Sequence, residues 1–233
     1  MRDEDKQIVR SLGLFHDMDA ARFDSLVNAA FLQRFPERVV LFREGEPSDF
    51  FHVVIDGVVE LFATLDERES TMTVLCPVST FILAAVLKDA VYLMSARTRT
   101  ASQILMIPSK SVRDAMAEDA AFARSIVGEL ANCYRGVVRN QKNLKLRTGA
   151  ERLASYLAHQ HARQGNSGRF TLPIDKKTLA SMLGMTPENL SRSFSTLRRA
   201  GVIVSGPDII IKSPEELIEI ARYAPLIDNL PER

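Results

Sequence analysis

The sequence predicts an α+β protein with an antiparallel β domain, a long helix, and a helix-turn-helix that is followed by a β hairpin. Residues 39–107 carry short runs rich in β-branched and aromatic residues, divided by turn sequences such as EGEPSD and LDERES, as in a small sandwich or barrel. Residues 119–147 carry apolar residues at alternating spacings of four and three, which is typical of one long helix. Residues 174–212 carry two short helical patterns and then two β-branched runs.

The composition is that of an ordinary soluble protein. Its 233 residues are 46% hydrophobic and 25% charged, which suits one or two domains with a sizeable core. No apolar run has the length of a membrane span, and the first residues, MRDEDKQ, contain no apolar signal core. We therefore expect a cytoplasmic protein with no membrane partner. The net charge is only +1, so any contact with nucleic acid must come from a local basic patch.

The N-terminal part is expected to begin with a helix at residues 20–35, ahead of strands that start at Val39. Apolar residues share one face of this helix, namely Phe23, Leu26, Val27, Ala30 and Phe31. Pro108 and Ser109 should end the strands, and the sequence SKSVRDAMAED should open a further helix.

A heptad seam is predicted along residues 119–147. Its members are Ile126, Leu130, Cys133, Val137, Asn140 and Leu144. A stripe this narrow suits pairing with a second copy of the chain, and a lone Asn in a seam often sets its register. The alternative is that the stripe packs on the β domain of its own chain. We favour the homodimer, in which close approach of the two helices would explain Gly128 and Gly136.

The sequence RTGAE interrupts this seam, so we expect a hinge near Thr148 and Gly149. A new amphipathic helix follows, with His159 and His161 solvated or at the domain junction. Residues 175–185 then form the first helix of a helix-turn-helix, in which the small Ala180 lets the two helices cross closely and Gly184 allows the tight turn between them. The sequence VIVSGPDIIIK reads as a β hairpin, which would form a wing.

The second helix of the pair begins at Thr186, whose side chain can cap the first amide groups, with Pro187 at the first helical position. Leu190, Phe194 and Leu197 form its apolar face. Its polar face consists of Glu188, Ser191, Arg192, Ser195 and Arg199. A polar face of this kind is most often only a solvated surface, but the helix-turn-helix signals favour DNA binding.

The whole arrangement resembles the CRP/FNR family of bacterial transcription regulators. The likeness covers nearly the full chain: GEPSDFFHVVIDGVVEL is similar to the family's β-roll hairpin, residues 119–147 to its dimer helix, and RTG to its hinge. It implies an N-terminal β-roll of the cyclic-nucleotide-binding kind, a dimerisation helix and a winged helix-turn-helix that binds double-stranded DNA, with RNA polymerase as a further partner. The corresponding domains are 1–118, 119–147 and 148–233.

The most specific part of the resemblance is PENLSR. Glu188, Ser191 and Arg192 match the E-x-x-S-R pattern of the FNR branch, which implies a palindrome close to TTGAT, four base pairs and ATCAA. The side chains agree with this: Arg192 can donate two hydrogen bonds to guanine, Glu188 can accept one from cytosine, and Ser191 is small enough to sit against a base edge. The residues expected at DNA phosphates are Lys176, Lys177, Ser195, Arg198, Arg199 and Lys212.

The signal that the β domain senses is less clearly indicated. Cyclic AMP is disfavoured, because Tyr92 and Leu93 stand near the place of the Arg-Ser pair that holds its phosphate in the family. A four-cysteine iron-sulfur cluster is also disfavoured, because the chain has only two cysteines, Cys76 and Cys133. The expected effector pocket is apolar and consists of Leu75, Phe81, Ile82, Leu83, Val86 and Leu87.

Such a pocket is compatible with haem, which some relatives that respond to nitric oxide or carbon monoxide use. The candidate axial ligands are Cys76, His52 and His16, although each also has an ordinary structural interpretation.

Two other classes of function compete with this interpretation. No Ser-His-Asp order, metal-spaced His/Glu cluster or glycine-rich phosphate loop indicates an enzyme. The second alternative is an adaptor whose helix-turn-helix contacts protein rather than DNA.

Overall fold

The computed structural model describes residues 3–165 and 168–228 and divides the chain into two compact units. Among the described residues, unit 1 comprises residues 3–133, and unit 2 comprises residues 134–165 and 168–228. The division therefore falls inside the long helix α5 (Ala120–Leu146) rather than at either end of it.

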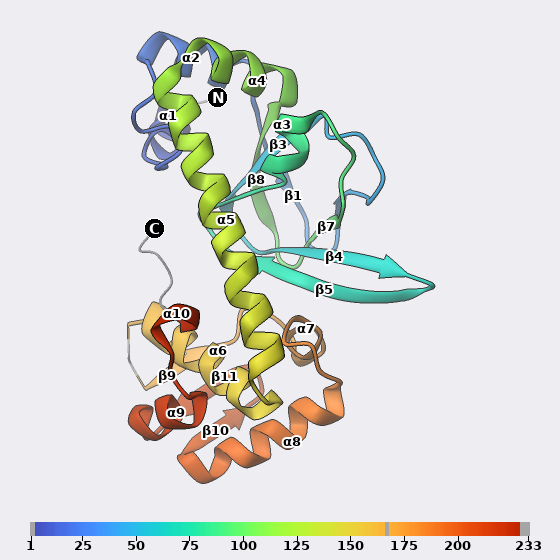
Figure 1. Ribbon diagram of the computed structural model, residues 1–233, viewed down its shortest axis with the longest axis vertical. Helices are drawn as coiled ribbons and strands as arrows, with labels where there is room; N and C mark the ends of the chain where they lie inside the picture. The colour runs from blue at the N-terminus through green and yellow to red at the C-terminus, as the bar shows by residue number, and fades with distance from the viewer. Residues whose placement is uncertain (1–2, 166–167, 229–233) are drawn as a thin grey trace. The chain divides into compact units, whose positions relative to one another are not determined.

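Unit 1 is built on two four-stranded antiparallel sheets (Figure 1). One has the order β1-β8-β3-β6 and the other β2-β7-β4-β5. The strands are β1 (Phe31–Phe35), β2 (Val40–Phe42), β3 (Phe50–Asp56), β4 (Val59–Leu65), β5 (Arg68–Leu75), β6 (Ser79–Phe81), β7 (Ser95–Thr98) and β8 (Ser102–Pro108). The helices are α1 (Asp3–Arg10), α2 (Ala20–Asn28), α3 (Leu83–Lys88), α4 (Ser109–Glu118) and the first half of α5. The predicted β domain and the helix opening at Ser109 are confirmed.

The helix expected at residues 20–35 is wrong in its second half. Helix α2 ends at Asn28, and Phe31 begins a strand that pairs with β8 from Phe31 opposite Met106 to Phe35 opposite Ser102. Phe31 is 58% exposed and does not continue the apolar face of the helix. The backbone pairing with a strand distant in sequence therefore overrides the local helical periodicity.

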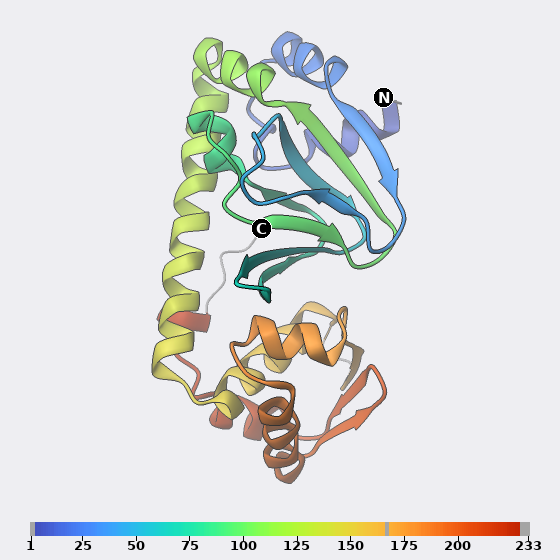
Figure 2. The ribbon, with the colours of Figure 1, turned by 90° about the vertical axis from the view of Figure 1, so that its right-hand side faces the viewer.

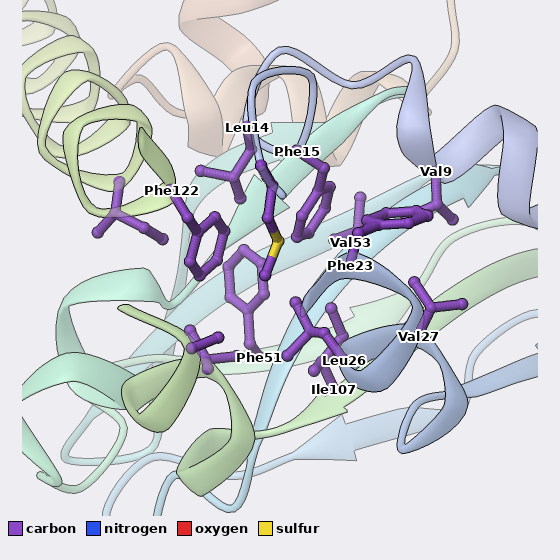
Figure 3. Close-up of a cluster of buried hydrophobic side chains, with 14 of the residues drawn as sticks. Val9, Leu14, Phe15, Phe23, Leu26, Val27, Phe51, Val53, Ile107 and Phe122 are labelled. Atoms are coloured by element: carbon purple, nitrogen blue, oxygen red, sulfur yellow. The ribbon is translucent and has the colours of Figure 1, made fainter. Parts of the chain in front are cut away.

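Two apolar cores lie in unit 1. The larger one joins α1, α2, α4 and the start of α5 to one sheet, and Figure 3 shows Phe122 of α5, Phe15 and Phe51 converging in it. Phe15 stacks on Phe122 with ring centroids 5.8 Å apart. The second core lies between the two sheets and contains Phe42, Phe81 and Tyr92. Burial of this many large side chains fixes the first turns of α5 against the β domain.

Unit 2 carries a three-stranded antiparallel sheet and five further helices among its described residues (Figure 2). Its elements after α5 are α6 (Gly149–Arg163), β9 (Arg169–Thr171), α7 (Lys176–Met182), α8 (Pro187–Leu197), a 3-10 turn (Arg198–Ala200), β10 (Val202–Ser205), β11 (Asp208–Ile211), α9 (Pro214–Ala221) and α10 (Pro225–Asp228). The order β10-β11-β9 places the predicted hairpin at one side of the sheet. The helix-turn-helix and its wing are thus confirmed.

The helix after the turn begins as the sequence indicates. Thr148 accepts a hydrogen bond from the amide of Glu151, and the Glu151 carboxylate accepts one from the Thr148 amide at 2.7 Å. These reciprocal bonds form a capping box. Of the two alternatives expected for the histidines beyond it, a solvated position is wrong for His161, which is 6% exposed and accepts a hydrogen bond at Nε2 from the amide of Gly168.

Candidate nucleic-acid interface

Helix α8 is held in place by caps and by a glycine turn. The side chain of Thr186 accepts a hydrogen bond from the amide of Asn189, and Pro187 occupies the first turn. Gly184, in the preceding turn, has φ +63°, and a Cβ built there would lie 2.9 Å from Leu144 Cδ2. Both the backbone conformation and the lack of space therefore require glycine at this position.

The two faces of α8 have opposite environments. Leu190, Phe194 and Leu197 are buried in the unit. The side chains of Glu188, Ser191, Arg192 and Ser195 are exposed. The three predicted base-reading residues therefore lie on the outer face of one rigid helix, where a partner can contact them.

The polar face is partly organised before any ligand binds. Arg192 Nη2 donates a hydrogen bond to the side-chain oxygen of Asn189, and Ser191 Oγ donates one to the carbonyl of Pro187 at 3.0 Å. The pKa of Glu188 is lowered by a hydrogen bond from Thr186, by its own backbone amide and by the charge of Arg192. Glu188 is therefore an ionised acceptor next to a cationic donor.

Asn189 is a polar residue of this face that the sequence patterns did not single out. It is exposed, it lies three residues before Arg192, and it fixes that guanidinium by the hydrogen bond just described. The (i, i+3) spacing of an amide and an arginine on one helix is a signal that could have identified it.

Each side chain predicted to contact phosphate is exposed. The set lies on α7, on α8 and the 3-10 turn after it, and beyond β11, as Lys176, Lys177, Ser195, Arg198, Arg199 and Lys212. Lys176 Nζ lies 5.9 Å from the ring centroid of Phe194, so the base of α7 contacts the helix it flanks. This arrangement supplies the local basic patch that a chain of net charge +1 needs to attract a polyanion.

The surface is hollowed beside the polar face of α8. A cavity of about 350 Å³ is lined by the start of α6, the turn after α7 and one side of α8. Arg152, Asn189 and Arg192 contribute polar groups to its wall. Of the three predicted base-reading residues, Arg192 therefore borders this recess.

The predicted seam divides between two environments. Ile126 has no exposed surface and lies in the core of unit 1, with Leu130 packed against that core. Ile126 must therefore be removed from the seam, since its own chain covers it. The remaining members, Cys133, Val137, Asn140 and Leu144, are exposed. Five exposed apolar residues of the helix, which we term the α5 stripe, are Val127, Tyr134, Val137, Val138 and Leu144, and Leu146 at the end of the helix is exposed as well.

The six residues of the expected effector pocket are split between the two cores of unit 1. Leu83, Val86 and Leu87 belong to the core around α1, α2 and α5. Leu75, Phe81 and Ile82 belong to the core between the sheets. The structure therefore does not gather all six around a single space.

An aromatic group fills the core between the sheets. Tyr92, near the position where the family's Arg-Ser pair is expected, is 3% exposed and stacks on Phe42 with centroids 4.0 Å apart. Its hydroxyl donates a hydrogen bond to the carbonyl of Phe50 at 3.3 Å. The rings that stack in this group belong to Phe42, Phe81, Tyr92 and the neutral His52, so the group itself offers no positive charge to a buried phosphate.

Arg97 on β7, a few residues after Tyr92, is engaged by two carboxylates. Arg97 Nε donates to Glu60 at 2.7 Å, and its other nitrogens donate to Glu69 at 2.5 and 3.0 Å. Glu60 is 1% exposed and also accepts a hydrogen bond from Thr71 at 2.5 Å. These carboxylates neutralise the guanidinium and leave it unsuited to a second anion.

The three candidate haem ligands have different surroundings. His52 is 3% exposed between Phe42 and Phe81, and burial lowers its pKa to about 4, so the ring is neutral near pH 7. Its Nδ1 atom has no hydrogen-bond partner. Cys76 is half-buried, and His16 is exposed and pairs with Asp17 at 2.7 Å. Only His52 offers a neutral buried nitrogen in an apolar setting.

Membrane-spanning segments and clustered metal ligands are both absent from residues 3–165 and 168–228. No helix there is long and apolar enough to cross a membrane. Nor does that part of the chain contain a group of three or more His, Cys, Asp and Glu side chains placed to bind a metal ion.

Each of the two units matches the model of a known domain family. A model of the Crp-like helix-turn-helix domain matches residues 151–220, and one of the cyclic nucleotide-binding domain matches residues 32–119. A solved protein from Silicibacter pomeroyi DSS-3, described as a cAMP-binding regulatory protein, is 31% identical over 95% of this chain and all of its own, with a TM-score of 0.65. FixK2 from Bradyrhizobium japonicum is 22% identical over 84% of this chain and 98% of its own, with a TM-score of 0.75.

A further relative is the CRP-like cAMP-activated global transcriptional regulator of Mycobacterium tuberculosis (strain ATCC 25618 / H37Rv). It is 22% identical over 222 residues, which are 93% of this chain and 99% of the relative. The similarity therefore extends over both units.

Proposed function

Because the chain belongs to the CRP/FNR family of transcription regulators, we propose that it is a homodimer that reads a palindrome close to TTGAT, four base pairs and ATCAA. The observation that carries the proposal is the exposure of Glu188, Ser191 and Arg192 on one face of α8, whose opposite face is buried. The family consists of transcription regulators rather than enzymes.

The base contacts follow from the donors and acceptors of these side chains. Arg192 donates two hydrogen bonds to O6 and N7 of guanine, and the ionised Glu188 accepts one from N4 of cytosine. Asn189 supports this by fixing the guanidinium before DNA arrives. Each pairing contributes about 1–3 kcal/mol of discrimination between bases.

The dimer is supported by the α5 stripe. Val127 and Tyr134 lie seven residues apart, as do Val137 and Leu144, which is the heptad repeat of a two-stranded coiled coil. Isolated exposed apolar residues are ordinary, but a repeat along a helix face favours a second helix as its cover. Two copies related by a two-fold axis would place their α8 helices in major grooves about 34 Å apart.

The signal is proposed to be neither cyclic AMP nor a four-cysteine iron-sulfur cluster. Although the relative in Mycobacterium tuberculosis is cAMP-activated, Tyr92 and Phe42 fill the core where this chain would have to hold the nucleotide, without a cation for its phosphate. Haem stays a candidate effector, for which His52 is the best placed axial ligand. An effector acts here by binding one of two dimer conformations more tightly than the other.

The experiment that tests the function is a binding titration of the wild type and Arg192→Ala on a TTGAT-type palindrome and on random DNA. The variant should lose about 1–3 kcal/mol on the palindrome, which is roughly a 5- to 150-fold rise in Kd, and much less on random DNA. Lys177→Ala is the matched control, since the loss of a phosphate contact should weaken both DNAs equally.

Equal losses for Arg192→Ala on both DNAs would contradict base reading. Failure of the wild type to bind the palindrome, with and without haem and nitric oxide, would favour the adaptor instead. An absorption spectrum of the purified protein titrated with haem, compared with that of His52→Leu, tests the ligand independently of DNA.

A further inference from the structure

The turn between α5 and α6 is bridged by one guanidinium. Arg152 Nη1 donates hydrogen bonds to the carbonyls of Arg147 at 2.6 Å and Leu144 at 3.5 Å, at the end of α5. Arg152 Nε donates to the carbonyl of Leu183 at 2.8 Å, and Nη2 donates to that of Gly184 at 3.3 Å, in the turn between α7 and α8. A single side chain therefore connects the end of the long helix to the turn that precedes the reading helix.

These four carbonyls are suitable partners for a cation. The last carbonyls of a helix lack N–H donors within the helix and carry the negative end of its dipole. The planar guanidinium presents several donors in a fixed fork, so it can serve two helix ends at once, which the single ammonium of lysine cannot do with the same geometry.

A buried ion pair between Arg147 and Asp228 also stabilises the turn between α5 and α6. Arg147 Nη1 and Nη2 donate to the two carboxylate oxygens of Asp228 at 2.8 and 2.6 Å, and both side chains are less than 5% exposed. Asp228 also accepts hydrogen bonds from Ser155 Oγ on α6 and from the amide of Ala224. The C-terminal helix α10 is thereby joined to the end of α5 and to the middle of α6.

Packing adds to these bonds. The side chain of Leu144 lies against Gly184, where no Cβ can be accommodated. At the start of α6, a Cβ on Gly149 would lie 3.3 Å from Ser193 Oγ of α8. Close contact on both sides of Thr148 favours a braced turn there over the hinge that the sequence predicts.

We propose that Arg152 is a positioning residue for DNA reading, which holds the end of α5 and the α7–α8 pair as one rigid body. The inference rests on the proposed function, because its consequence is the orientation of α8 relative to the dimer helix. Arg152 acts through carbonyl groups of its own chain and does not contact DNA. A change in α8 orientation then arises within α5, ahead of residue 144, instead of at Thr148 and Gly149.

The test compares Arg152→Gln with Arg163→Gln, which makes the same substitution at an exposed position of the same helix. Arg152→Gln should raise the Kd for the palindrome at least about tenfold. Arg152→Lys should recover only part of the loss, and Arg163→Gln should bind within about twofold of the wild type. The slope of log K against log salt should not change in Arg152→Gln, since no phosphate contact is lost.

Hydrogen exchange without DNA gives a second readout. The amides of residues 183–185 and 144–147 should exchange faster in Arg152→Gln than in Arg163→Gln, with the β domain unchanged. Unchanged palindrome binding by Arg152→Gln overturns the proposal, and so does a salt slope reduced by about one, which would identify a phosphate contact. If the wild type binds no DNA, the proposed function fails, and unchanged exchange in Arg152→Gln would then refute the bridge itself.

Discussion

The two halves of helix α5 carry the same apolar spacing but lie in different environments. The first half buries Phe122 and Ile126 completely in the core of unit 1. The second half leaves Tyr134 71% exposed and Val137 67% exposed. The alternating spacing of three and four residues thus indicates which residues share a face of the helix. Whether that face is buried depends on the segments that pack against it.

The largest expected effect is in the covered half. Phe122→Ala should lower the free energy of unfolding of unit 1 by about 3–5 kcal/mol, because it removes a ring that stacks on Phe15 and leaves a cavity. Urea unfolding followed by circular dichroism measures this. Arg124→Ala, an exposed change two residues away, should stay within about 0.5 kcal/mol. Similar losses in both variants would mean that the two sides of α5 are equally covered.

In the uncovered half we expect an effect on association instead of folding. In a homodimer, Val137→Glu would bury one carboxylate from each copy of the chain in the seam. The dimer dissociation constant should therefore rise about a hundredfold or more. Analytical ultracentrifugation measures this, with Asn132→Glu, on the opposite face of the helix, as the control. A dimer that tolerates Val137→Glu would place the interface elsewhere.

At the end of α5, the Arg147–Asp228 pair predicts a pH dependence. Burial raises the pKa of Asp228, but hydrogen bonds from Arg147, the Ala224 amide and Ser155 outweigh it, and the net pKa is lowered. The stabilisation is therefore fully present above the unfolded-state pKa of about 3.9 and is lost as the pH falls through the folded-state pKa. Asp228→Asn should cost about 1–3 kcal/mol at pH 7.

The same variant also tests the direction in which the stability changes with pH. Below about pH 4 the carboxylate becomes protonated first in the unfolded chain, so the stability difference between the wild type and Asp228→Asn should shrink, and it should disappear only below the lower folded-state pKa. Thermal unfolding of both proteins between about pH 3 and pH 7 measures this difference. A constant difference across that range would be evidence against an ionised Asp228 in the folded protein.

The smallest expected effect concerns the two glycines of α5. A Cβ added at Gly128 or Gly136 meets no atom of the chain within 4 Å, and both positions lie off the α5 stripe. Gly136→Ala should therefore stabilise the helix by up to about 1 kcal/mol and leave dimerisation unchanged. Weaker dimerisation, measured by ultracentrifugation, would instead support the close helix approach that the sequence suggested.

Local signals in the sequence are sufficient to identify much of the reading unit. Thr186 and Pro187 mark the start of α8, and the spacing of Leu190 and Phe194 separates its buried face from its exposed face. These features depend on residues within one or two turns of each other, so the sequence contains them directly. Asn189 was missed because its contact with Arg192 depends on a choice of side-chain conformation.

Other features depend on partners far away in the chain. Phe31 forms a strand because of β8, and Ile126 is covered because α1, α2 and β3 meet there. Arg147 pairs with Asp228, which is 81 residues away in the sequence, and Arg152 donates hydrogen bonds to carbonyls of the α7–α8 turn. The sequence around a polar side chain does not tell which distant segment will provide its hydrogen-bond partner, and the sequence of an apolar stripe does not tell which segment will pack against it.

By itself, therefore, the sequence determined the order of the elements, the caps of the reading helix and the two faces of α8, since backbone and neighbouring side chains alone decide them. Tertiary structure decided where the β domain begins, which part of α5 is covered, and that the turn at Thr148 is braced. The physical reason is that burial and hydrogen-bond satisfaction are properties of a place in the folded chain, and several segments must meet to create that place.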